Sequence, residues 1–120
     1  MLGETAAKYH KNGESCTACI FKACEEVYGV KFPDGVYDMN FALNNGLGIN
    51  GMCSAVITGV LFLGYYFRDD EAALGRARLY FLDNVHRRLG TSCCGKLKKC
   101  CKRAITVCGD TLEETIEKFG

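Results

Sequence analysis

The sequence has no apolar run at its N-terminus of the kind that an export signal needs, and it has a single proline, Pro33. It also lacks alternating β-branched runs, internal repeats and low-complexity segments. Positive and negative side chains nearly balance, at 15 against 14, so the net charge of +1 gives no global attraction for nucleic acid. These absences exclude a β-rich fold and a repeat array, and we expect the chain to reside in a reducing cytoplasm.

The glycines and the proline divide the chain into helical segments. We expect helices over residues 14–30, 51–67, 70–89 and 96–119. A break near Gly109 stays open, because Asp110 and Glu113 have the spacing of a capping pair. The sequence therefore predicts a single domain over residues 1–120, with an all-α fold in which four to five helices form a bundle.

No charged residue occurs from residue 39 to residue 67, and the second half of this segment is apolar on nearly every side of a helix. The apolar run is about 15 residues long, whereas a membrane span needs roughly 20. We therefore expect a buried central helix and no membrane span. Gly59 and Gly64 permit close approach of another helix or of a second copy of the chain, and we expect a homodimer.

Three glycines in front of this helix, Gly46, Gly48 and Gly51, have the spacing of a dinucleotide fingerprint. That motif requires a preceding buried strand, and residues 36–45 make a poor one. We interpret the glycines as a turn that brings the backbone close to a bound group. Backbone amides in such a turn are suited to hydrogen-bond the sulfur atoms of a cluster.

Cysteine is the residue type that the chain has in excess, with nine in 120 residues. They are Cys16, Cys19, Cys24, Cys53, Cys93, Cys94, Cys100, Cys101 and Cys108. An odd count argues against the disulfide framework of a secreted domain, so the thiols are buried, reactive or bound to metal. Cys24 and Cys108 have apolar neighbours at core spacing and are predicted to be small core residues. Cys16 and Cys19 form a CxxC at the start of a helix, where the helix dipole stabilises thiolate.

The order of these features resembles a family of redox-active proteins named for its cysteine pattern, C-GCAxxG-C-C. The domain is also similar to the cluster-bearing part of split-Soret cytochromes c. The resemblance rests on residues 15–20, on the glycine turn at 46–51, on residues 53–59 and on residues 81–105, and it covers most of the chain. Two positions depart from the pattern: Ser54 stands where the family has glycine, and Gly59 comes one residue late.

The resemblance implies an iron-sulfur cluster, for which we favour the 2Fe-2S type, and four metal ligands. The implied ligands are Cys16, Cys53, Cys94 and Cys101, with Gly46, Gly48 and Gly51 beside the cluster. The function implied is electron transfer or redox sensing with a partner protein, rather than conversion of a substrate.

The choice within each adjacent pair of cysteines follows from the apolar residue that comes after it. Cys94 is preferred to Cys93 because Leu97 stands three residues later. Cys101 is preferred to Cys100 because Ile105 stands four residues later.

Two other functions are consistent with the residues. One is a thiol-disulfide oxidoreductase with Cys16 as nucleophile and Cys19 or Cys53 as its partner. The other is a zinc-stabilised adaptor without catalysis, which uses the basic residues of segment 96–103 for a partner. His10 and His86 are isolated in the sequence and are not predicted to be ligands.

Overall fold

The computed structural model describes residues 1–120 and is entirely helical apart from turns and one isolated bridge between Met52 and Cys93. Six helices have seven residues or more, and a seventh, α6, is a single turn. Their bounds are α1 (Leu2–Lys11), α2 (Cys16–Tyr28), α3 (Asp34–Asn40), α4 (Ser54–Tyr66), α5 (Glu71–Leu89), α6 (Cys94–Leu97) and α7 (Cys101–Phe119). The all-α prediction is confirmed. None of these helices is long and apolar enough to cross a membrane.

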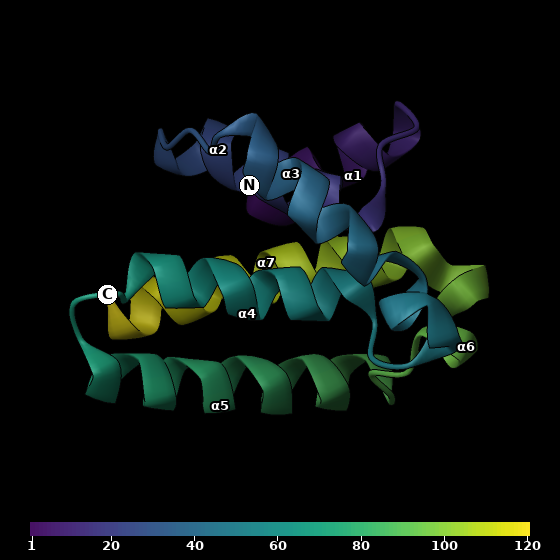
Figure 1. Ribbon diagram of the computed structural model, residues 1–120. Helices are drawn as coiled ribbons and strands as arrows, with labels where there is room; N and C mark the ends of the chain where they lie inside the picture. Colours follow the sequence, from purple (N-terminus) through teal and green to yellow (C-terminus); the bar gives the residue numbers. More distant parts are fainter.

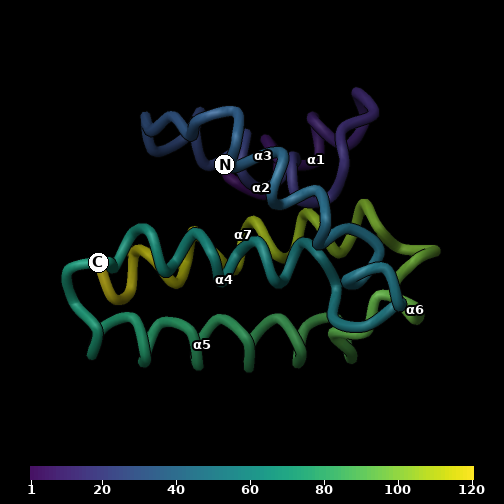
Figure 2. The backbone as a smooth tube through the Cα atoms, in the orientation of Figure 1, coloured from purple at the N-terminus to yellow at the C-terminus, as the bar shows by residue number.

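The helices form three layers, and α4 and α7 make up the middle one (Figure 1). Helices α1, α2 and α3 cover one side of the α4 and α7 pair, and α5 covers the other. Figure 2 shows that α4 and α5 run antiparallel and join at the end of the molecule opposite α6. The helix α7 contacts α1, α2, α4 and α5, so it connects all the layers.

The helix ends follow the local sequence signals. The side chain of Ser15 caps α2 by accepting a hydrogen bond from the Ala18 amide at 3.3 Å, and Asp70 caps α5 through the Ala73 amide at 3.0 Å. Gly90 ends α5 in the left-handed conformation, with φ of 78°. These residues explain why the predicted segments 14–30 and 70–89 lie within a few residues of α2 and α5.

The predicted number of four to five helices is wrong, because α1 and α3 were not expected. Helix α1 buries only Leu2, Gly3 and Ala6. These are too few apolar residues to show the repeat in the sequence that indicates a helix. Helix α3 buries no residue at all. The break near Gly109 that the sequence left open is absent, since α7 continues through this residue.

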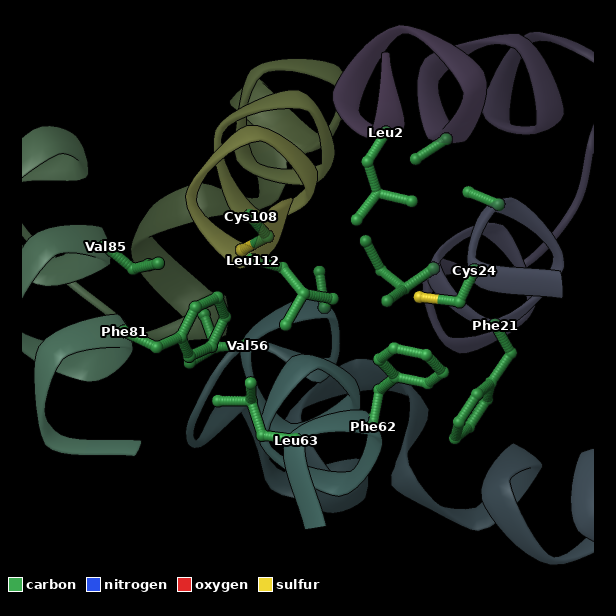
Figure 3. Close-up of a cluster of buried hydrophobic side chains, with 14 of the residues drawn as sticks. Leu2, Phe21, Cys24, Val56, Phe62, Leu63, Phe81, Val85, Cys108 and Leu112 are labelled. Atoms are coloured by element: carbon green, nitrogen blue, oxygen red, sulfur yellow. The ribbon is translucent and has the colours of Figure 1, made fainter. Parts of the chain in front are cut away.

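The core lies between the layers and contains 24 buried apolar residues (Figure 3). Phe62 of α4 and Phe81 of α5 are its largest fully buried side chains. Cys24 and Cys108 are fully buried among apolar side chains, which confirms their prediction as core residues.

The apolar helix α4 is central, as predicted, because it packs against α2, α5 and α7. It is not buried on every side. Leu61 and Tyr65 remain 43% and 38% exposed, because no other helix of the chain covers that face.

Candidate functional site

The four cysteines expected as ligands line a single small cavity of about 60 Å³. The other lining residues are Asn45, Ser54, Leu97, Lys98, Ala104 and Ile105. Cys53 is buried, and Cys16, Cys94 and Cys101 are partly exposed. The fold thus brings together thiols from four separate parts of the chain. All nine cysteines are free thiols.

Each of these four thiols lies at the start of a helix. Cys16 is the first residue of α2, Cys94 of α6 and Cys101 of α7, and Cys53 is the residue that immediately precedes α4. Figure 1 shows α6 and the starts of α4 and α7 at the same end of the molecule. The partial positive charge at the start of the three longer helices, α2, α4 and α7, favours an anionic thiolate or an anionic metal centre.

The electrostatics of the cavity show that the four thiols are close neighbours. Burial, followed by the neighbouring thiols of Cys101, Cys53 and Cys94, raises the pKa of Cys16 to about 11. Burial also raises the pKa of Cys53, although the backbone amides of Ala55 and Val56 oppose this by hydrogen bonding. Without a cation, Cys16 and Cys53 are therefore held in their neutral form.

The structure also separates the members of each adjacent pair. Cys94 and Cys101 line the cavity, whereas Cys93 and Cys100 do not. The Cys93 Sγ donates to the Asn50 carbonyl at 3.4 Å, and Cys100 is exposed to solvent.

Cys19 lies three residues after Cys16 on α2 and is fully buried. Its Sγ donates to the Glu14 carbonyl at 3.5 Å, and it does not line the cavity. Burial, with a smaller effect of Cys16, raises the pKa of Cys19 to about 12. A thiol with such a pKa is almost wholly protonated at neutral pH, and this makes it a poor partner in disulfide exchange.

The glycine turn lies against the cavity, and its backbone is unusual. Asn45, Gly46, Leu47 and Gly48 have consecutive positive φ angles of 60°, 58°, 63° and 78°. A Cβ at Gly46 would lie 2.8 Å from the Cys94 Cβ, so only glycine fits there. The Gly51 carbonyl accepts a hydrogen bond from the Cys94 amide at 2.6 Å. The turn therefore positions Cys94.

The expectation that the turn directs its amides at the sulfur atoms is not met by two of the three glycines. The Gly46 amide donates to the Ser54 Oγ at 3.3 Å, and the Gly51 amide donates to the Gly46 carbonyl at 3.0 Å. Gly48 is not among the residues that line the cavity. No strand precedes the turn, so the dinucleotide interpretation has no structural basis.

Three lining residues that sequence reasoning did not assign to the site have clear roles. The Ser54 Oγ donates to the Leu43 carbonyl at 2.7 Å and accepts from the Gly46 amide, so it fixes the turn beside Cys53. Asn45 adopts the left-handed conformation at the start of the turn. Lys98 adds the only charged side chain to the lining. The sequence did not reveal this role of Ser54, because its hydrogen bonds depend on how the preceding segment at residues 43–46 folds.

A larger, open cleft of about 1090 Å³ lies between α2 and α3 and contains no cysteine. Three of its six charged side chains are hydrogen-bonded within the chain. The Lys22 Nζ lies 2.6 Å from the Glu14 Oε1, and Glu25 accepts hydrogen bonds from the Tyr37 hydroxyl and the Phe32 amide. These contacts attach the segment at 32–37 to α2, so we assign them a structural role.

No known protein family, characterised protein or solved structure matches this chain significantly. The resemblance to the C-GCAxxG-C-C family therefore rests on the order of the residues given above. No group of three or more His, Cys, Asp or Glu side chains is placed so that it could hold a metal ion as the side chains stand. The donor set itself, four thiols around one cavity, fits the known ligands of an iron-sulfur cluster.

Proposed function

We propose that the protein is an electron-transfer or redox-sensing module that holds an iron-sulfur cluster, of the 2Fe-2S type, on Cys16, Cys53, Cys94 and Cys101. One observation carries this proposal: four thiols spread over residues 16–101 line the same cavity at the starts of helices. Core packing alone gives no reason to gather four partly polar thiols at one end of a bundle, because a small apolar residue would fill each position equally well.

The spacing of the four cysteines in the sequence favours a cluster over a zinc ion. Structural zinc sites are typically built from two pairs of ligands, and the members of each pair lie a few residues apart. Cys16, Cys53 and Cys94 are instead separated by long stretches of the chain. Four cysteines are also the usual ligand set of a 2Fe-2S cluster.

The surrounding residues suit a redox centre. A bound cluster supplies one-electron exchange at a potential that depends on burial, charge and hydrogen bonds. Leu97, Ala104 and Ile105 are buried and line the cavity, so they exclude water from one side of it. The helix starts and Lys98 provide positive potential that stabilises an anionic centre.

The thiol-disulfide alternative finds less support. Cys16 and Cys19 are both held protonated, with pKa values of about 11 and about 12. A nucleophilic cysteine in exchange reactions has a pKa near the ambient pH. We therefore retain this alternative only as an outcome of the experiment below. A reducing cytoplasm is the location we propose, since the four cysteines must be thiols to receive metal.

We also propose a homodimer. The uncovered face of α4, with Leu61 and Tyr65, supplies an apolar surface for a second copy. Sedimentation equilibrium of the purified protein tests this directly, and a monomer at micromolar concentration would contradict it.

The test of function is purification without oxygen, followed by visible absorption and measurement of iron, sulfide and zinc. We expect a brown protein with equal iron and sulfide. Single alanine substitutions of the four proposed ligands should each abolish the absorption, whereas Cys93→Ala and Cys100→Ala should preserve it. These two are matched controls, because each removes the thiol adjacent to a proposed ligand. Circular dichroism checks that every variant is folded.

Other results would replace the proposal with one of the two alternatives. Stoichiometric zinc without iron, lost together with the fold on chelation, would show the adaptor. A colourless, metal-free protein that loses two thiols on mild oxidation would show the dithiol enzyme.

A further inference from the structure

The segment at 96–103 carries five exposed positive side chains. They are Lys96, Lys98, Lys99, Lys102 and Arg103. None of them forms an ion pair within the chain. Residues 91–109 contain no acidic residue, so nothing in this part of the sequence offsets the charge. Although the whole molecule is nearly neutral, this one segment is strongly positive.

The glycine turn places exposed apolar side chains beside the positive segment. Leu47, Ile49 and Met52 are 51%, 78% and 45% exposed. The turn is attached to α6 by the hydrogen bond from the Cys94 amide to the Gly51 carbonyl and by the contact of Cys93 with Asn50. We call the surface formed by residues 47–52 and 96–103 the basic face.

The conformation of the turn is costly to maintain. Leu47 has φ of 63°, a left-handed conformation that is unfavourable for a residue with a Cβ. About half of its side chain remains exposed to solvent, so burial offsets little of this strain. Such strain persists where the exposed arrangement itself is used.

The basic face lies beside the thiol cavity, because Lys98 belongs to both. Cys94 and Cys101, the first residues of α6 and α7, also line the cavity, and the positive segment runs from α6 through a short 3-10 turn into α7. A protein bound to this face is therefore placed beside the four cysteines. A route for an electron through this face is short, because it need not cross the core.

We propose that the basic face is the docking surface for an acidic redox partner protein. This inference rests on the proposed function and adds the class of partner. One electron leaves the cofactor of the reduced partner and enters the centre held by the four cysteines, so the partner is oxidised by one electron and the centre is reduced by one. An apolar patch beside a charged segment is the composition expected of a protein interface.

Nucleic acid fits this surface less well. Proteins that bind single strands use aromatic side chains for stacking, and the basic face has none. Proteins that bind duplexes neutralise many phosphates along an extended surface, whereas here the positive residues occupy one segment of eight.

The experiment is a calorimetric titration of the full chain, purified without oxygen, with a bacterial flavodoxin as the acidic redox probe. We expect binding that weakens as salt rises from about 0.02 M to about 0.15 M. The double variant Lys99→Glu with Lys102→Glu should weaken binding by about tenfold or more. The matched control is Arg76→Glu with Arg78→Glu, which makes the same change in net charge on α5 and should have a much smaller effect.

A second variant tests the apolar part of the surface. Ile49→Ser should weaken binding by several-fold and leave the salt dependence unchanged, because it removes apolar contact and no charge. Visible absorption of each variant reports the cluster separately. A missing cluster with specific binding would overturn the proposed function alone, and an intact cluster with no binding would overturn the docking surface alone.

Two further results would also overturn the docking surface. One is an equal loss of affinity in the 99/102 and 76/78 variants, which would show that only net charge matters. The other is tighter binding of a 20-base-pair DNA duplex than of flavodoxin, lost in the 99/102 variant, which would assign the surface to nucleic acid.

Discussion

Gly59 allows α4 and α5 to approach each other closely. A Cβ at this position would lie 2.4 Å from the Cζ of Phe81, which is fully buried and has no free space to move into. Gly64 lies in the same helix, and a Cβ there would meet no atom within 4 Å. The two glycines therefore have different effects on packing, although both were expected to be points of close approach.

The pair leads to a prediction at the scale of single residues. Gly59→Ala should lower the free energy of unfolding by about 1–3 kcal/mol, because the added methyl group overpacks the core. Gly64→Ala should raise it by about 0.5–1 kcal/mol, because alanine loses less backbone entropy in a helix. Urea denaturation of both variants measures the difference. If the two substitutions had the same effect, the packing of Phe81 on α4 would be wrong.

Among the helices, α5 and α7 are joined by a polar contact in addition to their apolar faces. The Glu114 Oε1 lies 2.9 Å from the Arg88 Nη2 and accepts a hydrogen bond from the Tyr80 hydroxyl at 2.7 Å. Hydrogen bonding from Arg88, and then from Tyr80, holds the pKa of Glu114 below its ordinary value. The ionised form of Glu114 is therefore the form that the folded state prefers.

This contact predicts a pH dependence. A lowered pKa in the folded state stabilises the protein above the unfolded pKa of about 4.3, and the contribution is lost as pH falls through the lower folded pKa. Because the Glu114 side chain is 43% exposed, solvent screening limits the contribution to about 1 kcal/mol or less. Urea denaturation at several pH values should show Glu114→Gln less stable than the parent above pH about 5, with the gap closing toward pH about 3. Glu117→Gln, an exposed neighbour on α7, is the control and should leave the profile unchanged.

The helices that could be predicted from the sequence alone have two features. Their apolar residues recur at helical spacing, and recognisable residues cap or end them. Helix α5 has its cap at Asp70 and its terminator at Gly90, and its bounds were predicted within one residue. The capping pair of Asp110 and Glu113, which left a break near Gly109 open, does not begin a new helix, because α7 is continuous there. Gly109 instead serves close packing. A Cβ at Gly109 would lie 2.6 Å from the Cα of Gly3, so the glycine lets α1 lie against α7. This contact could not be predicted, because Gly3 and Gly109 lie at opposite ends of the sequence.

For the candidate site, the sequence indicated which four cysteines to consider. The structure places these four cysteines around one cavity. The convergence of helix starts was beyond sequence reasoning, because it depends on how α2, α4 and α7 pack. The left-handed turn was only partly foreseen. Glycine at 46 and 48 suggested it, but Asn45 and Leu47 adopt the same conformation without being glycine.

For the whole molecule, the core extends well beyond the candidate site, although Cys53, Leu97, Ala104 and Ile105 belong to both. The large buried side chains of Phe62, Phe81 and Leu112 do not line the cavity. Most of the core therefore packs without contact with a group bound in the cavity. This separates the protein from small zinc domains that unfold without metal.

This separation predicts the effect of removing the metal centre. Chelation under reducing conditions should leave the far-ultraviolet circular dichroism nearly unchanged and lower the Tm, because a group that binds only the folded state stabilises it. For a domain of this size, each kcal/mol of lost binding lowers the Tm by roughly 4 °C. Calorimetry of the loaded and stripped protein measures the shift. Complete loss of helical signal on stripping would show instead that the centre organises the fold.

The arrangement of the four cysteines along the chain has a consequence for the order of biosynthesis. Roughly 40 residues separate Cys16 from Cys53, and again Cys53 from Cys94, so a group that joins all four closes two long loops. Closing them in an unfolded chain is entropically unfavourable, whereas the packed helices α2, α4 and α7 have already brought the loop ends together. If the protein binds the proposed cluster, its chain should fold first, and the cluster should be delivered to a folded protein rather than to a nascent chain.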